Sequence, residues 1–331
     1  MNAAVIGAGS WGSAFARYLG SIGLPTRLWI REEDIYRAAL ETRENAVFLP
    51  GFVFPETVGF SNDLRETSSF GDVVFVAVPS QFCRFVYTRM APALRKDQMI
   101  VSLTKGFDKK TLMRMSQVME EVFRPHVRPR LAVLHGPSFA KEVAAGHPTA
   151  LAVASRVPAV AREVQHLISS LTIRAYTSSD VTGVEVAGAL KNVIAIAAGI
   201  VDALKFGLNS RAALITRGLV EITNLGIALG GRKETFSGLA GIGDLVLTCT
   251  GELSRNHRVG HELGQGRPLG EILAGTRMVA EGVHTTVAAR RLARALGVEM
   301  PISEQIYQIL YRGKAVRKAV DELMSRALKA E

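Results

Sequence analysis

Short apolar runs alternate with helix-like stretches through the first half of the chain. Apolar segments occur at residues 3–6, 26–30, 73–78, 99–103, 131–134, 150–154 and 173–176. Runs that are apolar throughout are typical of strands buried on both faces of a sheet. Segments with helical spacing, such as residues 14–19, lie between them. The pattern predicts a mainly parallel sheet with helices on both faces, the doubly wound α/β architecture.

The second half of the chain has a different pattern. After Thr177 helical spacing dominates, at residues 187–204, 211–229, 257–264, 285–296 and 303–311. Ser179 or Asp180 could cap the first helix, and Thr182 and Glu185 have the spacing of a capping box. We therefore expect a Rossmann-type dinucleotide-binding domain in residues 1–178. An all-helical domain for substrate binding and catalysis, residues 179–331, follows without a linker, which favours a shared cleft.

Composition and charge narrow the classes of protein. Of the 331 residues, 48% are hydrophobic and 21% are charged, as in globular proteins with a sizeable core. The net charge of +10 is spread over both halves without a basic tail or block, so we expect an anionic small molecule and no nucleic acid as partner. The longest apolar runs fall short of a membrane span. Two distant cysteines and no signal peptide favour the cytoplasm.

A glycine-rich turn follows the first predicted strand. Gly7, Gly9 and Gly12 form the pattern G-x-G-x-x-G, with Ser10 and Trp11 inside it. After a strand and before a helix, this pattern is typical of a dinucleotide site, where the helix N-terminus meets the pyrophosphate. The alternative is a tight turn without a ligand.

The end of the second predicted strand bears on the choice of cofactor. An acidic residue there binds the ribose of NAD, whereas an arginine accommodates the 2′-phosphate of NADP. Arg31 lies 19 residues after Gly12 and is followed by Glu32 and Glu33. This mixed signal modestly favours NADP over NAD, and a solvated charged turn is the alternative.

Further candidates lie after later strands and in the helical half. Lys105 and His135 follow strands, where ligands of open α/β sheets bind, although His135 is more typical of a hydrogen-bonded structural residue. Lys191 interrupts an otherwise apolar helix, so it is expected to be paired or to reach solvent along the helix edge. Asp244, after a glycine-dense turn, is its candidate partner. The residue spacings indicate no metal site.

These segments, in this order, resemble the bacterial type of NAD(P)-dependent glycerol-3-phosphate dehydrogenases. The resemblance covers residues 7–12, 102–106, 135–143, 189–199, 238–249, 254–260 and 279–285. Its most specific parts are Leu-Lys-Asn at 190–192, Gly-Ile-Gly-Asp at 241–244 and Ser-Arg-Asn at 254–256.

The resemblance implies roles by position. Lys191 would donate and accept the proton. The substrate would contact Lys105, Gly136, Ser138, Lys191, Asp244, Ser254, Arg255 and Asn256. The cofactor would contact Gly7, Gly9, Ser10, Trp11, Gly12, Arg31, Lys105, Ala140, Arg255, Val279 and Glu281.

The implied reaction is the reversible oxidation of sn-glycerol 3-phosphate to dihydroxyacetone phosphate. A homodimer that supplies phospholipid synthesis is implied as well. Three alternatives remain at this point: a β-hydroxyacid or ketopantoate type of dehydrogenase, a non-catalytic NADP-binding sensor or scaffold, and a basic nucleic-acid binder. The Ser254–Asn256 loop favours a phosphorylated substrate, because arginine binds phosphate oxygens in a bidentate manner.

Overall fold

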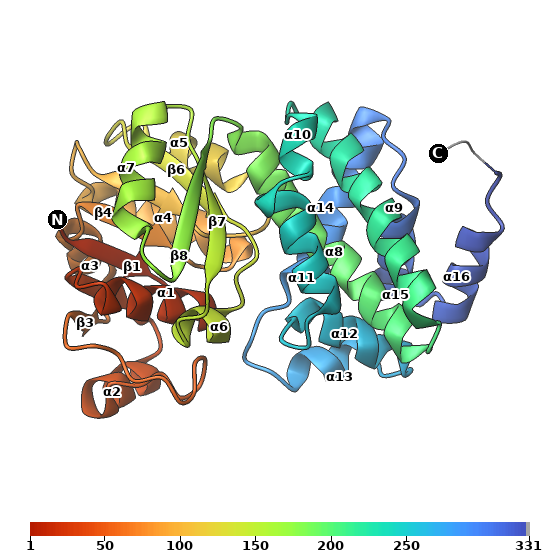
Figure 1. The fold of residues 1–331 in the computed structure, drawn as a ribbon, viewed down its shortest axis with the longest axis horizontal. Coiled ribbons are helices and arrows are strands. Elements are labelled where there is room, and N and C mark those ends of the chain that lie inside the picture. Colours follow the sequence, from red (N-terminus) through yellow and green to blue (C-terminus); the bar gives the residue numbers. More distant parts are fainter. Residues whose placement is uncertain (329–331) are drawn as a thin grey trace. The chain divides into compact units, whose positions relative to one another are not determined.

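The computed structural model describes residues 1–328, and they form two compact units (Figure 1). The first is Met1–Glu185, and the second begins at Val186. The expected domain boundary after residue 178 stays a prediction.

An eight-stranded sheet forms the centre of the first unit. Its order is β3-β2-β1-β4-β5-β6-β7-β8, and every neighbouring pair is parallel except the antiparallel β6 and β7. The first six strands have the order of a Rossmann fold. The strands are β1 (Ala3–Ile6), β2 (Thr26–Trp29), β3 (Val58–Ser61), β4 (Val73–Val76), β5 (Met99–Ser102), β6 (Arg130–His135), β7 (Thr149–Ala154) and β8 (Ile173–Ser178).

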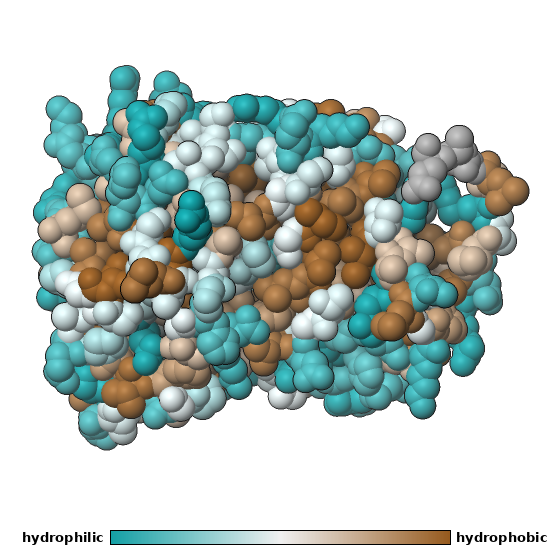
Figure 2. All heavy atoms as spheres, in the orientation of Figure 1, coloured by the Kyte–Doolittle hydropathy of each residue, from teal (hydrophilic) through white to brown (hydrophobic). Residues whose placement is uncertain are grey.

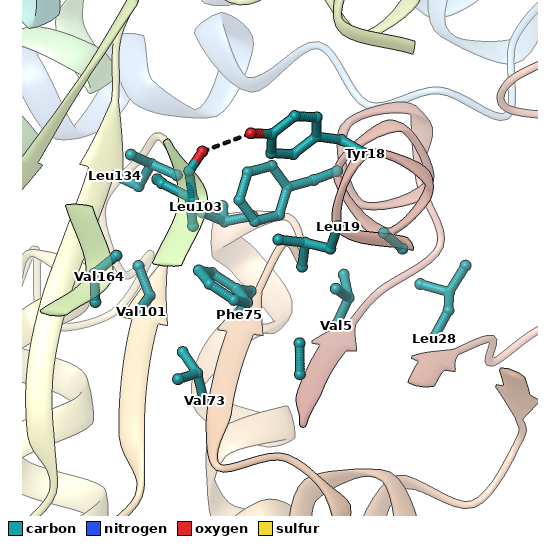
Figure 3. Packing of buried hydrophobic residues seen from close by; sticks show 14 of the residues in the cluster. Val5, Tyr18, Leu19, Leu28, Val73, Phe75, Val101, Leu103, Leu134 and Val164 are labelled. Atoms are coloured by element: carbon teal, nitrogen blue, oxygen red, sulfur yellow. Dashed lines mark hydrogen bonds between the residues drawn. The ribbon is translucent and has the colours of Figure 1, made fainter. Parts of the chain in front are cut away.

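Helices cover both faces of this sheet, as the apolar strands require. Figure 3 shows Val5, Phe75 and Val101 from three strands packed with Tyr18 and Leu19 of α1. The helices are α1 (Ser10–Ser21), α2 (Glu33–Thr42), α3 (Leu64–Phe70), α4 (Ser80–Met90), α5 (Met115–Phe123), α6 (Ala140–Ala144) and α7 (Pro158–Ile168). The predicted doubly wound architecture is thus confirmed.

The second unit is helical. It consists of most of α8 (Val181–Ala203), α9 (Gly207–Ala228), α10 (Lys233–Phe236), the π-helical turn Leu239–Gly243, α11 (Asp244–Thr250), α12 (Arg255–Gly264), α13 (Leu269–Ala274), α14 (Glu281–Leu296), α15 (Pro301–Arg312) and α16 (Val316–Met324). The predicted all-helical character of the second half is confirmed.

Helix α8 corrects two details of the sequence analysis. The whole helix, Val181–Ala203, is long and apolar enough to cross a membrane, although its most apolar runs are short. Its most apolar window is completely buried within the protein, as in the core helix of a soluble protein.

The predicted capping box is wrong. Asp180 caps the helix by accepting from the Gly183 N–H at 2.8 Å, whereas Glu185 binds Arg114 and Ser116.

Helices α8 and α12 approach each other at glycines. A Cβ on Gly199 would lie 1.9 Å from the carbonyl oxygen of His257, and a Cβ on Gly260 would lie 1.9 Å from that of Ile196. These distances are far below van der Waals contact, so any larger side chain would push the helices apart. The two glycines therefore allow α12 to pack this closely on α8.

Candidate active site

The glycine-rich turn has the geometry that a dinucleotide site requires. Gly7 has φ +108°, a conformation that favours glycine. A Cβ on Gly12 would lie 1.9 Å from the carbonyl oxygen of Gly7, so the helix can follow the strand this closely only without a side chain. Nothing lies within 4 Å of the Cβ position of Gly9, which leaves open space beside the first N–H groups of α1.

Two further features of this turn fit an anionic cofactor. The first turn of α1 carries no acidic residue, so its positive dipole end is not offset by a carboxylate. The indole N–H of Trp11 is buried and has no hydrogen-bond partner within the described chain. A buried donor without a partner is costly, and a bound ligand oxygen would satisfy it. The residues present therefore fit NAD or NADP.

Asn45 supports the turn and was missed by the sequence analysis. Its side-chain amide is fully buried and donates to the Ala8 carbonyl oxygen at 2.7 Å and to the Ser13 hydroxyl at 2.9 Å. Ser13 donates to the same carbonyl oxygen at 3.0 Å. No local pattern points to this role, because Asn45 lies in an irregular segment after α2.

Arg31 follows β2, where the ribose discriminator was expected. Its side chain is 64% exposed and pairs with the Glu32 carboxylate at 2.5 Å. Its guanidinium lies 6.0 Å from the centre of the Phe82 ring on α4. The positive group is therefore accessible to a phosphate, and Glu32 offers an acceptor beside it.

The turns after β5 and β6 bring together the other candidates of the first unit. The Lys105 ammonium group donates to the Gly136 carbonyl oxygen at 3.2 Å, and the Ser138 hydroxyl donates to the same oxygen at 3.0 Å. Ala140 begins α6 and packs in one small apolar cluster with Trp11. Lys105, Gly136, Ser138 and Ala140 thus lie at the same edge of the sheet as the glycine turn.

His135 has a structural environment. Its ring is buried, with Nδ1 3.0 Å from the Val184 carbonyl oxygen and Nε2 3.1 Å from that of Thr104. The ring thereby connects the start of α8 with the residue before Lys105. This agrees with the interpretation of His135 as a hydrogen-bonded structural residue.

Lys191 lies buried in the second unit and is paired. Its side chain is 7% exposed, and its ammonium nitrogen lies 2.5 Å from Oδ1 of Asp244. The same nitrogen donates to the Thr248 hydroxyl at 2.6 Å, which in turn donates to the Asp244 backbone carbonyl at 2.6 Å. The expected partnership of Lys191 and Asp244 is confirmed, whereas Thr248, one helical turn after Asp244, was missed.

Cys249 follows Thr248 but does not have the properties of a nucleophile. Its thiol is buried, and this burial raises its pKa to about 12, even though Lys191 nearby acts in the opposite direction. The thiol therefore stays protonated at neutral pH and fills space in the core.

Asn192 and Asn256 connect α8, α12 and the start of α14. The Asn256 amide donates to Oδ1 of Asn192 at 2.9 Å, and its own Oδ1 accepts from the Gly282 N–H at 2.9 Å. Ser254 caps α12 by accepting from the His257 N–H at 3.2 Å. The Ser254–Asn256 segment is thus held next to the residue that follows Lys191.

Arg255 has no hydrogen-bond or ion-pair partner for its guanidinium within the described residues. The side chain is exposed, but enough protein surrounds the charged group for desolvation to lower its pKa. Glu281, the first residue of α14, acts in the opposite direction, and Val279 lies just before it. A guanidinium whose hydrogen-bond donors are not used within the described residues is available to bind a phosphate.

A charged cluster fixes the next residue of α12. Nε2 of His257 lies 2.7 Å from Oδ2 of Asp202, at the end of α8. Arg211 of α9 donates to Oδ1 of the same carboxylate at 2.8 Å. Together with the glycine contacts, this cluster holds α12 on α8. Neither Asp202 nor His257 was a sequence candidate.

The candidates therefore fall into two groups, one in each unit. Gly7 to Gly12, Arg31, Lys105, Gly136, Ser138 and Ala140 belong to the first, and Lys191, Asp244, Ser254 to Asn256, Val279 and Glu281 to the second. Among residues 1–328, no group of three or more His, Cys, Asp or Glu side chains could hold a metal ion.

Comparison with known proteins identifies the family. The model of the NAD-dependent glycerol-3-phosphate dehydrogenase N-terminus matches residues 2–161, and that of the C-terminus matches residues 180–321. Glycerol-3-phosphate dehydrogenase [NAD(P)+] of Geobacter sp. (strain M21) is 53% identical over 99% of this chain and 98% of its own. Its counterpart in Syntrophotalea carbinolica is 52% identical over 100% of this chain and 99% of its own.

A solved structure agrees with these sequences. The crystal structure of glycerol-3-phosphate dehydrogenase from Coxiella burnetii is similar with a TM-score of 0.94 and 38% identity, over 98% of this chain and 99% of that one. Both family models and the full-length relatives lead to the same conclusion. The chain belongs to the family of NAD-dependent glycerol-3-phosphate dehydrogenases.

Proposed function

We propose that this chain catalyses the reversible NAD(P)-dependent conversion of sn-glycerol 3-phosphate to dihydroxyacetone phosphate. The observation that carries the proposal is the buried ion pair of Lys191 and Asp244, in a chain of this dehydrogenase family. A lysine is almost never fully buried unless it is paired, and a buried ionisable pair of this kind is a candidate for a functional site. The guanidinium of Arg255 has no hydrogen-bond partner among the described residues, so it is available to bind the phosphate of this substrate.

Lys191 is the proposed general acid and base. In the reductive direction its ammonium group would donate a proton to the ketone oxygen, so that a fixed positive charge meets the developing alkoxide. Asp244 and Thr248 would orient this group. In the oxidative direction, the neutral amine would take the hydroxyl proton. The nicotinamide, when bound, supplies or accepts the hydride.

The substrate-binding roles remain proposals from position and chemistry. Arg255 would bind the phosphate, with Ser254 and Asn256 as neutral polar groups beside it. Lys105, Gly136 and Ser138 would contact substrate from the first unit, and Lys105 would also contact the cofactor.

The cofactor is NAD or NADP, and we propose a modest preference for NADPH because of Arg31. Gly7, Gly9, Ser10, Trp11 and Gly12 would hold the pyrophosphate, with Ala140 close by. Arg255, Val279 and Glu281 are proposed to contact the cofactor from the second unit. Replacing Arg31 with alanine should remove the preference for NADPH while leaving turnover with NADH unchanged, as measured by kcat/KM for each cofactor.

We further propose that the protein is a cytoplasmic homodimer whose product supplies phospholipid synthesis. These three statements rest on the family resemblance and on the frequency of two-fold symmetric dimers among soluble oligomers.

A spectrophotometric assay tests the reaction directly. Purified protein is mixed with dihydroxyacetone phosphate and either NADPH or NADH, and the absorbance of the reduced nicotinamide is followed. We expect consumption that requires the phosphate group, so unphosphorylated dihydroxyacetone is the matched control. Consumption of both ketones at equal rates would contradict the role of Arg255.

A different result would favour one of the alternatives. If folded protein binds cofactor but turns over neither ketone, a panel of keto acids distinguishes another dehydrogenase from a non-catalytic sensor. The sensor predicts binding without turnover for the whole panel.

A further inference from the structure

A cavity of about 410 Å³ opens in the first unit. Its apolar wall includes Val127, Leu131, Val133, Val157 and Val181. The Val157 side chain is 53% exposed to solvent there. None of the residues proposed for cofactor or substrate lines the cavity. Its volume lies within the usual range of small-molecule sites, which are mostly apolar with a few polar groups.

Three guanidinium groups line this cavity, and two of them have no partner. Arg156 is neutralised by Glu120 at 2.9 Å. Arg124, directly after α5, and Arg128, in the loop before β6, have no guanidinium hydrogen bond or ion pair anywhere in residues 1–328. The cavity therefore carries a positive excess beside its apolar wall.

The neutral polar groups of the cavity are already used. The Ser155 hydroxyl donates to the Leu131 carbonyl oxygen at 2.6 Å, and the Ser116 hydroxyl donates to the Glu185 carboxylate at 2.6 Å. A ligand would thus find two unpaired guanidinium groups as its main polar anchors, and an apolar wall for the rest of its surface.

We propose that this cavity binds a compact amphipathic anion, a short apolar body that carries one carboxylate or phosphate group. The anionic group would pair with Arg124 and Arg128, and the apolar body would cover Val157 and Leu131. A purely ionic ligand would leave the apolar wall exposed to water. A neutral ligand would leave the two guanidinium groups without an ion-pair partner. The site is separate from the proposed reaction and does not depend on it.

Calorimetric titration of the full-length protein with octanoate and octyl phosphate tests the proposal. Saturating NADPH and glycerol 3-phosphate are included, so that neither probe is counted at the proposed reaction site. We expect one site per chain. The double variant Arg124→Gln, Arg128→Gln should weaken binding at least about tenfold, as for the loss of charge-assisted hydrogen bonds.

The matched control is Arg162→Gln on α7, an exposed arginine outside the cavity, and it should bind the probes as the wild type does. Val157→Asp should also abolish binding, because it places a negative charge on the apolar wall. Thermal unfolding checks that each variant is folded.

Three results would overturn the proposal. Equal binding of octanol and octanoate would show that the guanidinium groups take no part, and equal binding of inorganic phosphate and octyl phosphate would show the same for the apolar wall. Unchanged affinity in the double variant would place the probe elsewhere.

Discussion

Lys191 combines a charged group with an environment that opposes charge. It lies in a helix whose apolar window is completely buried, and the Asp244 carboxylate and the Thr248 hydroxyl surround its ammonium group. Removing one partner of a buried pair leaves the other charge unpaired, which is more costly than losing the pair as a whole. Substitutions at this residue therefore affect both stability and activity, and a test must separate the two.

Lys191→Arg is expected to separate them. An arginine keeps the positive charge next to Asp244 but does not release its proton in proteins. We expect kcat to fall at least about 100-fold, the lower range for a lost acid or base, while the affinity for NADPH stays close to that of the wild type. Steady-state kinetics and cofactor titration measure the two quantities.

Lys318→Met on α16, an exposed lysine, is the control and should retain full activity. Turnover of Lys191→Arg within a few-fold of the wild type would remove Lys191 from the proton transfer.

Glu221 is a buried carboxyl group without a role in the proposed reaction. It accepts hydrogen bonds from the N–H groups of Ile302 and Ser303, at 2.6 and 3.1 Å, and from the Ser303 hydroxyl at 2.9 Å. These donors favour the carboxylate, but burial outweighs them and raises the pKa of Glu221 from 4.5 to about 7.

This shift predicts a pH dependence of stability. The folded protein holds the Glu221 proton more tightly than the unfolded chain does, so the stabilisation is complete below pH 4.5 and is lost as the pH rises through about 7. The contribution is up to about 3 kcal/mol. Urea unfolding measures the free energy of unfolding at pH 5 and at pH 8. The difference between these two values should be smaller for Glu221→Gln than for the wild type. Glu271→Gln, at an exposed position, should not change the difference.

At the scale of elements, the approach of α8 and α12 determines where Arg255 and Asn256 lie. The backbones touch at Gly199 and Gly260, and the Asp202–His257 pair holds the helices together nearby. A change in helix separation would move the proposed phosphate-binding turn relative to Lys191.

Gly260→Ala tests this coupling. Its Cβ would lie 1.9 Å from the Ile196 carbonyl oxygen, so α12 must shift. We expect a loss of about 1–3 kcal/mol in the free energy of unfolding, as for other overpacked sites, and a several-fold increase in KM for dihydroxyacetone phosphate.

The same substitution elsewhere should have the opposite effect. At Gly270 of α13 nothing lies within 4 Å of the Cβ position, so Gly270→Ala should stabilise the protein by about 0.5–1 kcal/mol. Equal effects of the two alanines on stability and on KM would show that helix separation does not matter.

The sequence predicted those strands and helices whose pattern of apolar and polar residues corresponds to the faces that are buried. Strands β1 and β4 are apolar throughout, and β5 is apolar up to Ser102 at its end, because both faces of these strands are covered. All three were predicted. Strand β3 was missed because Gly59 and Ser61 interrupt its apolar pattern at the edge of the sheet. The short helices α11 and α13 were also missed, because six or seven residues are too few to show a helical period.

The candidate site shows the same division. The glycine turn is recognised by the spacing of its glycines, and Lys191 is recognised because it interrupts an apolar run. Asn45, Thr248 and His257 act through partners distant in the sequence or through a helix that the pattern did not reveal. No local property of these residues distinguishes them from other polar residues.

At the scale of the whole molecule, an exposed apolar surface indicates where two copies of the chain could associate. Figure 2 shows an apolar area over α9 and α11. Val220, Ile227 and Val246 of these helices are 37–45% exposed. Contiguous apolar surface of this kind is typical of protein interfaces, and the area is our candidate for the contact between two copies.

Sedimentation should give a mass near twice the 35.7 kDa of one chain. Ile227→Asp should shift the protein toward the monomer, because it would bury a carboxylate without a partner. Leu40→Asp, at an exposed position on α2 of the first unit, should leave the mass unchanged. A wild-type monomer at micromolar concentration would contradict the dimer.

The unpartnered indole of Trp11 also makes tryptophan fluorescence a probe of this protein. The chain has two tryptophans, Trp11 and Trp29, and both belong to the first unit. The Trp29 N–H is bonded to the Asn62 carbonyl oxygen at 3.1 Å. Trp29→Phe would leave Trp11, beside the glycine turn, as the single tryptophan of the chain. The fluorescence of Trp11 would then follow cofactor binding to the first unit without an added dye. The helical unit has no tryptophan and would add no tryptophan background.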